Sequence, residues 1–247
     1  MFKKLVKKFI PFQIRKKLRK LEAKLFGVDN DFKNMNNSDI FDKIYKEGRW
    51  GKNIDGDSIS GSGSHEVNII QPYISKVSNF LLDVKPTTIV DLGCGDFNIG
   101  KNFVKFSKKY IACDVSNEIL NRNKKNFFSF NNVSFNLLDL SKDFLPKGDV
   151  CFLRQVLQHL SNIDIKNFVH NLNSIKPYKY LVITEHLPRN ENFKANLDKI
   201  SGSNLRLIYD SGVVLHKEPF NLNYSNIKHL HEVYEDEGRI KTIVYQF

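Results

Sequence analysis

Two acidic residues and a pair of glycines are the residues of this sequence whose types and spacing best suit chemistry. Asp91 lies in the apolar run 89–92, which leads into Gly93 and Gly95, and a second apolar run ends in Asp114. Glycine lets the backbone turn tightly and approach a ligand without a Cβ in the way. An acid at the tip of the next strand can accept hydrogen bonds from two ribose hydroxyls. The pattern indicates a parallel α/β sheet that holds an adenosine group.

The glycine spacing separates two classes of nucleotide cofactor. A dinucleotide-binding fingerprint needs a third glycine at position 98, where this sequence has Asn98, and Gly100 comes two residues too late. The stretch instead resembles the first motif of class I methyltransferases that use S-adenosylmethionine (SAM), in which an acid stands two residues before Gly-x-Gly. The resemblance implies that SAM is the cofactor and that it is held by Asp91, Gly93, Cys94, Gly95, Asp114 and Val115.

The same resemblance implies three more cofactor contacts further along the chain. Asp139 is expected beside the adenine, where it takes the exocyclic amine, and Leu140 is expected to cover the ring. The alternative for Asp139 is a turn or helix cap before Ser141. Gln155 directly follows the fourth strand of the expected sheet, so its amide can reach the methionine part of the cofactor.

Three residues near strand ends are candidate catalytic groups. His159 lies four residues after Gln155 and can project from the same helical face. A histidine with a pKa near neutrality can take the proton of an attacking hydroxyl; the alternative is that His159 only packs below its loop. Glu185 and His186 leave the fifth expected strand, and because adjacent side chains on an extended backbone point to opposite faces, we expect one of them in the pocket.

The segment before the expected sheet contains the candidate acceptor-binding residues. A Gly/Ser loop over residues 60–64 precedes a helix, so its amides and hydroxyls could hold a carboxylate or a phosphate; a flexible linker is the alternative. Trp50, next to Arg49, and Arg154 after the fourth strand could contribute to the same pocket. The predicted acceptor-binding set is Trp50, Ser62, His65, Glu66 and Arg154.

The stretch from Trp50 to Glu66, together with the later Gly-Cys-Gly-Asp-Phe-Asn, resembles methyltransferases of bacterial surface-glycan clusters. This resemblance implies methyl transfer to an oxygen of a small molecule or sugar in capsule modification. Methylation of a phosphoramidate or phosphate oxygen of a capsule precursor is one alternative. An RNA-binding or RNA-modifying enzyme and a binding module without catalysis are two others. The three cysteines, Cys94, Cys113 and Cys151, favour a reducing cytoplasm, and no metal is expected.

The positive charge of the chain is concentrated at its beginning. Residues 1–26 carry ten basic residues and one acidic residue, and thus +9 of the net charge of +11. The nearly neutral charge of the body argues against nucleic acid as a partner. Leucines and other apolar residues recur in the arm at helical spacing, and Pro11 is expected to separate two short helices. A basic amphipathic arm is typical of segments that bind an anionic membrane surface, here the inner face of the cell membrane; packing on the body or on a partner subunit is the alternative.

The rest of the chain alternates between expected strands and helices. After residue 85 the pattern predicts a Rossmann-like, seven-stranded α/β sheet, mostly parallel, closed by an antiparallel hairpin. We expect strands at 88–92, 110–114, 133–137, 149–153, 180–184, 229–234 and 239–246, and helices at 38–45, 67–82, 99–107, 117–126, 156–160 and 164–174. The predicted division is a basic arm (1–26), an N-terminal cap (27–84) and a cofactor-binding core (85–247).

Overall fold

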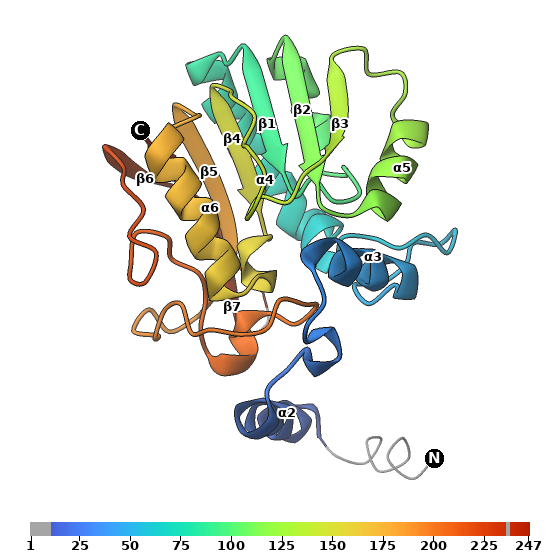
Figure 1. The fold of residues 1–247 in the computed structure, drawn as a ribbon, viewed down its shortest axis with the longest axis vertical. Helices are drawn as coiled ribbons and strands as arrows, with labels where there is room; N and C mark the ends of the chain where they lie inside the picture. Colours follow the sequence, from blue (N-terminus) through green and yellow to red (C-terminus); the bar gives the residue numbers. More distant parts are fainter. Residues whose placement is uncertain (1–10, 236–237) are drawn as a thin grey trace.

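A seven-stranded sheet runs through the middle of the molecule in the computed structural model, which describes residues 11–235 and 238–247 (Figure 1). The strand order is β3-β2-β1-β4-β5-β7-β6, and all neighbours are parallel except the pairs that involve β7. This confirms the predicted fold class. The strands are β1 (Thr88–Leu92), β2 (Lys109–Asp114), β3 (Val133–Leu137), β4 (Val150–Arg154), β5 (Tyr180–Pro188), β6 (Asn226–Glu235) and β7 (Gly238–Gln246).

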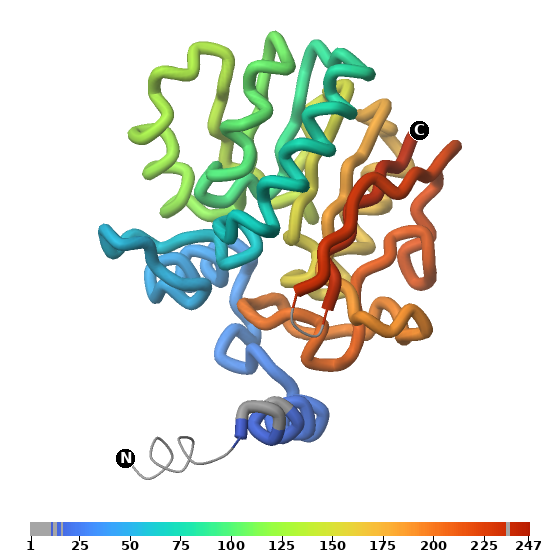
Figure 2. Tube along the Cα trace, turned by 180° about the vertical axis from the view of Figure 1, so that it is seen from behind, coloured from blue at the N-terminus to red at the C-terminus, as the bar shows by residue number. Residues whose placement is uncertain are grey.

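Helices cover both faces of this sheet. Figure 1 shows α6 in front of β4 and β5, and Figure 2 shows α4 on the opposite face. Three helices begin at a polar residue whose side chain accepts a backbone N–H, namely Asn36, Ser116 and Ser161. The α-helices are α2 (Phe12–Phe26), α3 (Asn37–Glu47), α4 (Val67–Val84), α5 (Asn117–Asn126) and α6 (Asn162–Ile175).

The core consists of two apolar layers, one on each side of the sheet. Ile89 and Val150 point to the α4 side, and their chain neighbours Val90 and Cys151 point to the α6 side. All four side chains are fully buried. Strands buried on both faces are apolar without interruption, which is why the sequence shows continuous apolar runs rather than alternation.

Two predicted helices are shorter and tighter than expected. Residues 99–107 form two 3₁₀ turns, η3 (Gly100–Asn102) and η4 (Val104–Phe106), instead of one α-helix. Asn102 explains the difference, because its side-chain amide donates to the carbonyls of Asn98 and Ile99 and so competes with helical bonding. The predicted helix 156–160 is likewise one 3₁₀ turn, η5 (Leu157–His159).

The loops at the carboxyl ends of the strands are covered by segments from both ends of the chain. Helix α3 lies below β1 and β2 (Figure 1), preceded by η1 (Asn30–Phe32), and η2 (Ser62–Ser64) precedes α4. The long connection 189–225 between β5 and β6 contains η6 (Arg206–Tyr209) and lies between the sheet and α2. Of the two helices expected in the arm, α2 is present directly after Pro11, and the other lies outside the described residues.

Candidate active site

A glycine turn after β1 forms the floor of the site. Gly93 and Gly95 have positive φ values of 73° and 54°, which side chains with a Cβ adopt only under strain. The amides of Gly93 and Cys94 both donate to the carbonyl of Cys113 on β2, at 2.8 and 2.9 Å, so the turn is fixed against the next strand. A Cβ at Gly95 would collide with the hydroxyl of Ser60, so only glycine leaves this floor open.

Two buried carboxyls flank the glycine turn. Asp114 accepts hydrogen bonds from the amide of Gly95 at 2.9 Å and from the amide of Ser116 at 3.0 Å, and burial raises its pKa to about 6. Asp91 accepts from the hydroxyl of Tyr110 at 2.9 Å, and burial raises its pKa to about 7. Both side chains line the pocket above the turn. Each can therefore accept hydrogen bonds from a ligand held there.

A cavity of about 300 Å³ occupies the carboxyl edge of the sheet. Its size is at the lower end of the range for small-molecule sites. Its wall contains every predicted cofactor-binding residue: Asp91, Gly93, Cys94, Gly95, Asp114, Val115, Asp139, Leu140 and Gln155.

Asp139 forms the turn cap that was one of its two alternatives, and it also lines the cavity. Its Oδ1 accepts hydrogen bonds from the amide of Ser141 at 3.0 Å and from the hydroxyl of Ser141 at 2.6 Å, which is a turn cap. The same residue also lines the cavity, where the side-chain amide of Asn37 on α3 lies 3.4 Å from its Oδ2. The cap orients the carboxylate and does not remove it from the wall.

Hydrogen bonds join the Gly/Ser loop to the residue that follows the glycine turn. The amide of Ser60 donates to Asp96 Oδ2, and the amide of Asp96 donates back to the hydroxyl of Ser60, both at 2.8 Å. His65 Nε2 lies 2.6 Å from the same carboxylate oxygen. Burial raises the pKa of Asp96, but the hydrogen bonds from His65 and Ser60 outweigh it and lower that pKa overall. The loop therefore forms a roof over the cavity.

Arg154, at the end of β4, joins this roof to the sheet. Its guanidinium donates to the hydroxyl of Ser64 at 2.9 Å, to the carbonyl of Gly63 at 2.5 Å and to the side chain of Gln155 at 2.7 Å. It also lies over the ring of Tyr73, 4.9 Å from the centroid. Burial lowers the pKa of Arg154, and in the described part of the chain its Nε has no hydrogen-bond partner. This buried cation is part of the cavity wall.

The structure separates the other predicted acceptor-binding residues. Trp50 and Ser62 line the cavity, and the hydroxyl of Ser62 lies 3.5 Å from Glu235. His65 is outside the wall because its ring turns to Asp96, and Glu66 is exposed where α4 begins. The expectation that His65 and Glu66 face the cavity is therefore corrected. Arg49 also points away and pairs with Asp31 and Glu47.

His159 has a protein partner at each ring nitrogen. Nδ1 lies 3.1 Å from the carbonyl of Gly202, which can only accept, so Nδ1 carries the proton. Nε2 then accepts from the side-chain amide of Gln158 at 3.3 Å. Burial lowers the pKa of His159 to about 3, and its ring packs 4.8 Å from that of Trp50. This geometry favours the packing alternative over the role of a base.

Glu185 and His186 point to opposite faces of β5, as alternation requires. Glu185 is turned away from the cavity, and its Oε1 accepts from the amide of Leu157 at 3.1 Å at the start of η5. Burial raises the pKa of Glu185 to about 8. The expectation of a catalytic Glu185 is therefore corrected: it supports the loop after β4. His186 lines the cavity, and its amide donates to Gln158 at 3.1 Å.

Several wall residues carry no sequence signal that we recognised. Phe41 and Tyr45 of α3 pack against Trp50, with ring centroids 5.9 and 5.4 Å apart, and the aromatic stripe of that helix could have indicated them. Ser203 and Leu205 come from the irregular connection after β5, and the carbonyl of Ser203 accepts from the indole N–H of Trp50 at 3.2 Å. Their position depends on tertiary contacts that no local pattern encodes.

The described residues contain neither a candidate metal-binding group nor a candidate membrane-spanning helix. No group of three or more histidine, cysteine or acidic side chains there is arranged to hold a metal ion. Within the same residues, none of the helices combines the length and the apolar character that crossing a membrane requires.

Solved structures share this fold, although the sequences are distant. N-methyltransferase NodS from Bradyrhizobium japonicum WM9, in complex with S-adenosylhomocysteine (SAH), superposes with a TM-score of 0.56 at 12% identity, covering 83% of this chain and 99% of that one. The N-terminal domain of EvdMO1, in the presence of SAH and D-fucose, superposes with a TM-score of 0.53 at 16% sequence identity. The match covers 87% of this chain and 98% of that one. The methyltransferase domain of bacterial CtHen1 superposes with a TM-score of 0.52 at 16% sequence identity. The match covers 72% of this chain and 98% of that one. No family model and no curated protein matches the sequence.

The sheet order, the glycine turn after β1 and these superpositions define the fold class. This chain has the Rossmann-like fold of class I methyltransferases, with the C-terminal antiparallel hairpin that the sequence predicted.

Proposed function

We propose that this protein is a SAM-dependent methyltransferase that transfers the methyl group to an oxygen of a small molecule or glycan precursor. The observation that carries the proposal is the cradle at the carboxyl edge of the sheet. There, a glycine turn with positive φ values at Gly93 and Gly95 and the buried Asp114 face the same cavity.

The residues of the cavity fit SAM. Asp114 offers a carboxylate at the strand tip for the ribose hydroxyls, and Asp139 and Leu140 offer an acceptor and an apolar side chain for the adenine. Gln155 and Asp91 are available to the methionine part. The cofactor supplies an activated methyl group on a sulfonium, so this chain has to position an acceptor and exclude water.

His186 is the residue that we assign to the proton of a neutral hydroxyl acceptor. Both His186 and His159 lie in the cavity wall, but burial lowers the pKa of His159 to about 3, which makes His159 a poor base. Trp50 would provide a flat apolar surface in the same cavity, as suits a sugar ring. The EvdMO1 domain crystallised with SAH and D-fucose supports a sugar as the acceptor class.

A phosphate or phosphoramidate oxygen is the second candidate acceptor, and Arg154 favours it. This buried guanidinium places a cation in the cavity wall. Such an acceptor is already anionic, so it would need a cation rather than a base.

The proposal extends to the cellular setting. We infer that the enzyme acts in the cytoplasm on precursors of a surface polysaccharide or capsule, and that its basic arm brings it to the inner face of the membrane. The fully buried Cys151 and the buried Cys113, both free thiols, fit a reducing compartment.

The experiment is a methyl-transfer screen with radiolabelled SAM against nucleotide-activated sugars, capsule fragments and phosphoramidate intermediates. With a hydroxyl acceptor, His186→Ala should lower kcat by about 10²–10⁴-fold and leave SAH affinity unchanged. With an anionic acceptor, Arg154→Gln should instead raise KM. If the protein transferred no methyl group to any oxygen acceptor, or methylated only amines, the proposal would be overturned.

A further inference from the structure

The apolar side of helix α2 is turned to the outside of the molecule. Ile14, Leu18, Leu21 and Leu25 follow one another at intervals of four, three and four residues, so they form one stripe along the helix. Their side chains are 50%, 50%, 54% and 67% exposed. A stripe of this kind usually packs against the core of its own protein. Here it does not.

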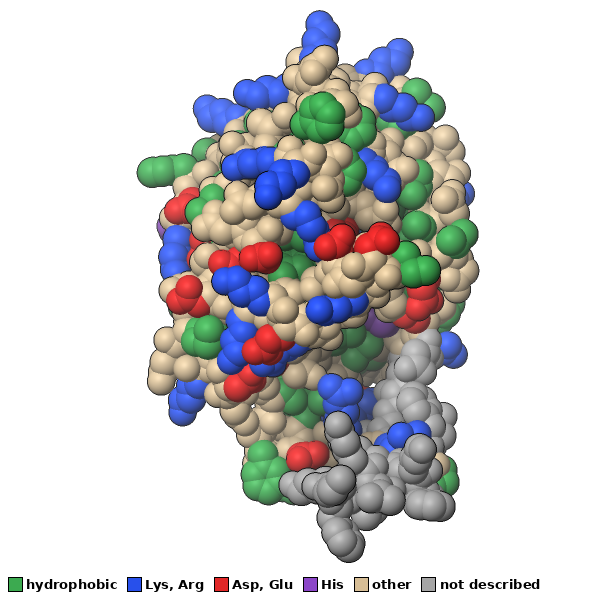
Figure 3. All heavy atoms as spheres, turned by 90° about the vertical axis from the view of Figure 1, so that its right-hand side faces the viewer, with side chains coloured by type: hydrophobic (Ala, Val, Ile, Leu, Met, Phe, Trp, Pro, Cys, Tyr) green, Lys and Arg blue, Asp and Glu red, His purple; other side chains and the backbone are tan. Residues whose placement is uncertain are grey.

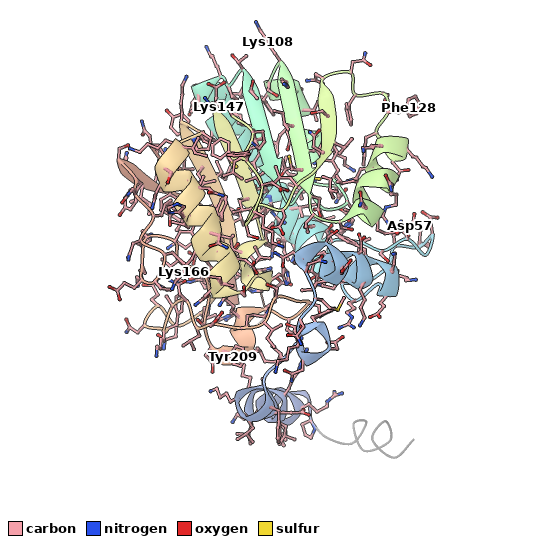
Figure 4. All side chains as sticks on the ribbon, viewed as in Figure 1. Asp57, Lys108, Phe128, Lys147, Lys166 and Tyr209 are labelled. Atoms are coloured by element: carbon pink, nitrogen blue, oxygen red, sulfur yellow. The ribbon has the colours of Figure 1, made fainter. Side chains whose placement is uncertain are left out.

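The opposite, polar side of α2 makes the contacts with the body. Lys20 Nζ lies 2.6 Å from Asp210 Oδ1, and Lys24 Nζ lies 3.5 Å from Asp210 Oδ2. Arg19 donates to the side chain of Asn204 at 2.8 Å, and Ala23 is only 3% exposed. Figure 1 shows α2 at the end of the molecule below the connection 189–225, and Figure 4 shows Tyr209 of that connection next to the helix.

These contacts fix which side of the helix is free. Ala23 lies two positions from both Leu21 and Leu25, which is roughly 200° around an α-helix. With Ala23 and two lysines against the body, the leucine stripe has to point away from it. The docked orientation therefore presents an unpartnered apolar face.

The positive charge of residues 1–26 indicates which kind of partner binds this apolar face. Residues 1–26 carry +9, while the remaining chain carries only +2 and, on the face drawn in Figure 3, mixes acidic and basic side chains. A second copy would bring two arms of the same high charge together, which is unfavourable. An apolar stripe in a basic helix suits a surface with acyl chains and anionic headgroups. We propose that the outward stripe of α2 binds an anionic membrane surface.

The helix is also connected to the wall of the cavity. Asp29, shortly after α2, pairs with Lys199 at 3.2 Å, and neither side chain is exposed. Asp29 also accepts from Asn204, the residue between Ser203 and Leu205 of the cavity wall. This connection keeps the cavity near the lipid surface when α2 is bound. That the cavity holds an acceptor rests on the proposed function.

The test is co-sedimentation of the full chain with vesicles of phosphatidylcholine alone or with added phosphatidylglycerol. The wild type should bind the anionic vesicles, less strongly in high salt, and should not bind phosphatidylcholine. Leu18→Glu/Leu21→Glu should weaken binding by about tenfold or more, because two outward leucines become anionic. The matched control is Leu82→Glu/Ile163→Glu, which places the same charge on two exposed apolar positions of α4 and α6 and should bind like the wild type.

Three results would overturn the inference: no binding of the wild type to anionic vesicles, equal loss in the control and the α2 variant, or a wild-type dimer that the α2 variant dissociates. The last result, read by sedimentation velocity, would make the stripe an interface between copies. SAH affinity measured on the same samples separates this inference from the proposed function. Vesicle binding without SAH binding would reject only the proposed enzymatic function. SAH binding without vesicle binding would reject only the proposal that α2 binds a membrane.

Discussion

At the scale of single residues, the environment of each titratable group decides its role. Three residues were candidate catalytic groups in the sequence, and only His186 of them remains one. His159 fails because both of its ring nitrogens have protein partners, and Glu185 fails because its side chain is turned away from the cavity. The sequence could predict that one of Glu185 and His186 faces the cavity, because alternation on a strand is local. It could not predict which one, because that depends on the side of the sheet that the cavity occupies.

The pKa of Glu185 leads to a prediction about stability and pH. Its folded-state pKa of about 8 lies above the ordinary value of 4.5, so the folded state holds an extra proton between these two pH values. Glu185 therefore costs stability as the pH rises through this range. Glu185→Gln should be more stable than the wild type at pH 8.5 by about a few kcal/mol, and nearly equal to it at pH 4.5. Urea unfolding at the two pH values measures this difference.

The matched control for this experiment is Glu66→Gln, because the side chain of Glu66 is exposed. Its stability should follow the wild type at both pH values. A Glu185→Gln variant that also follows the wild type would show that the carboxyl is ionised in the folded protein, against this account.

At the scale of elements, the sequence predicted strands better than helices and connections. Every predicted strand is present. The signal is clearest for the central strands β1 and β4, because strands buried on both faces need unbroken apolar runs. The predicted helix at 99–107 failed because one side chain, Asn102, competes with the backbone. The cavity wall from the connection 189–225 was not predicted at all, since contacts such as the pair of Asp29 with Lys199 join residues far apart in the chain.

The roof loop should depend on Asp96, because this carboxylate accepts from both Ser60 and His65. Asp96→Ala removes these bonds, and each bond lost from a partly buried group costs about 1–3 kcal/mol. We expect faster amide hydrogen exchange across residues 58–66 and weaker SAH binding. Asp57→Ala, at an exposed position of the neighbouring loop seen in Figure 4, is the control and should change neither. Unchanged protection of Ser60 in Asp96→Ala would contradict this dependence on Asp96.

The buried pair of Asp29 and Lys199 should hold the connection 189–225 to the segment after α2. Asp29→Ala leaves a buried cation without its partner and should lower the free energy of unfolding by about 3–5 kcal/mol. The exposed pair of Asp31 and Arg49 is the control, and Asp31→Ala should cost at most about 1 kcal/mol. Adding Lys199→Met to Asp29→Ala should restore part of the loss. Equal effects of the two aspartate variants in urea unfolding would show that burial does not distinguish the pairs.

At the scale of the whole molecule, the carboxyl edge of the sheet organises everything that we assign to function. The glycine turn, the strand-tip acids, the roof loop and the wall from the β5–β6 connection all meet there, and α2 lies at the same end of the molecule (Figure 1). The sequence could predict this meeting point, because the carboxyl ends of parallel strands share one edge. The charge distribution adds a second property of the whole chain, with a nearly neutral body and a basic arm.

Calorimetric titration with SAH tests the central claim, that the cradle around Gly95 and Asp114 holds the cofactor. The wild type should bind SAH at one site. Asp114→Ala should weaken binding by about 10²–10⁴-fold, because two hydrogen bonds to a carboxylate are lost at about 1.5–3 kcal/mol each. Asp83→Ala, at an exposed position of α4, should bind like the wild type. No heat of binding with the wild type, or equal affinity in Asp114→Ala, would contradict the account.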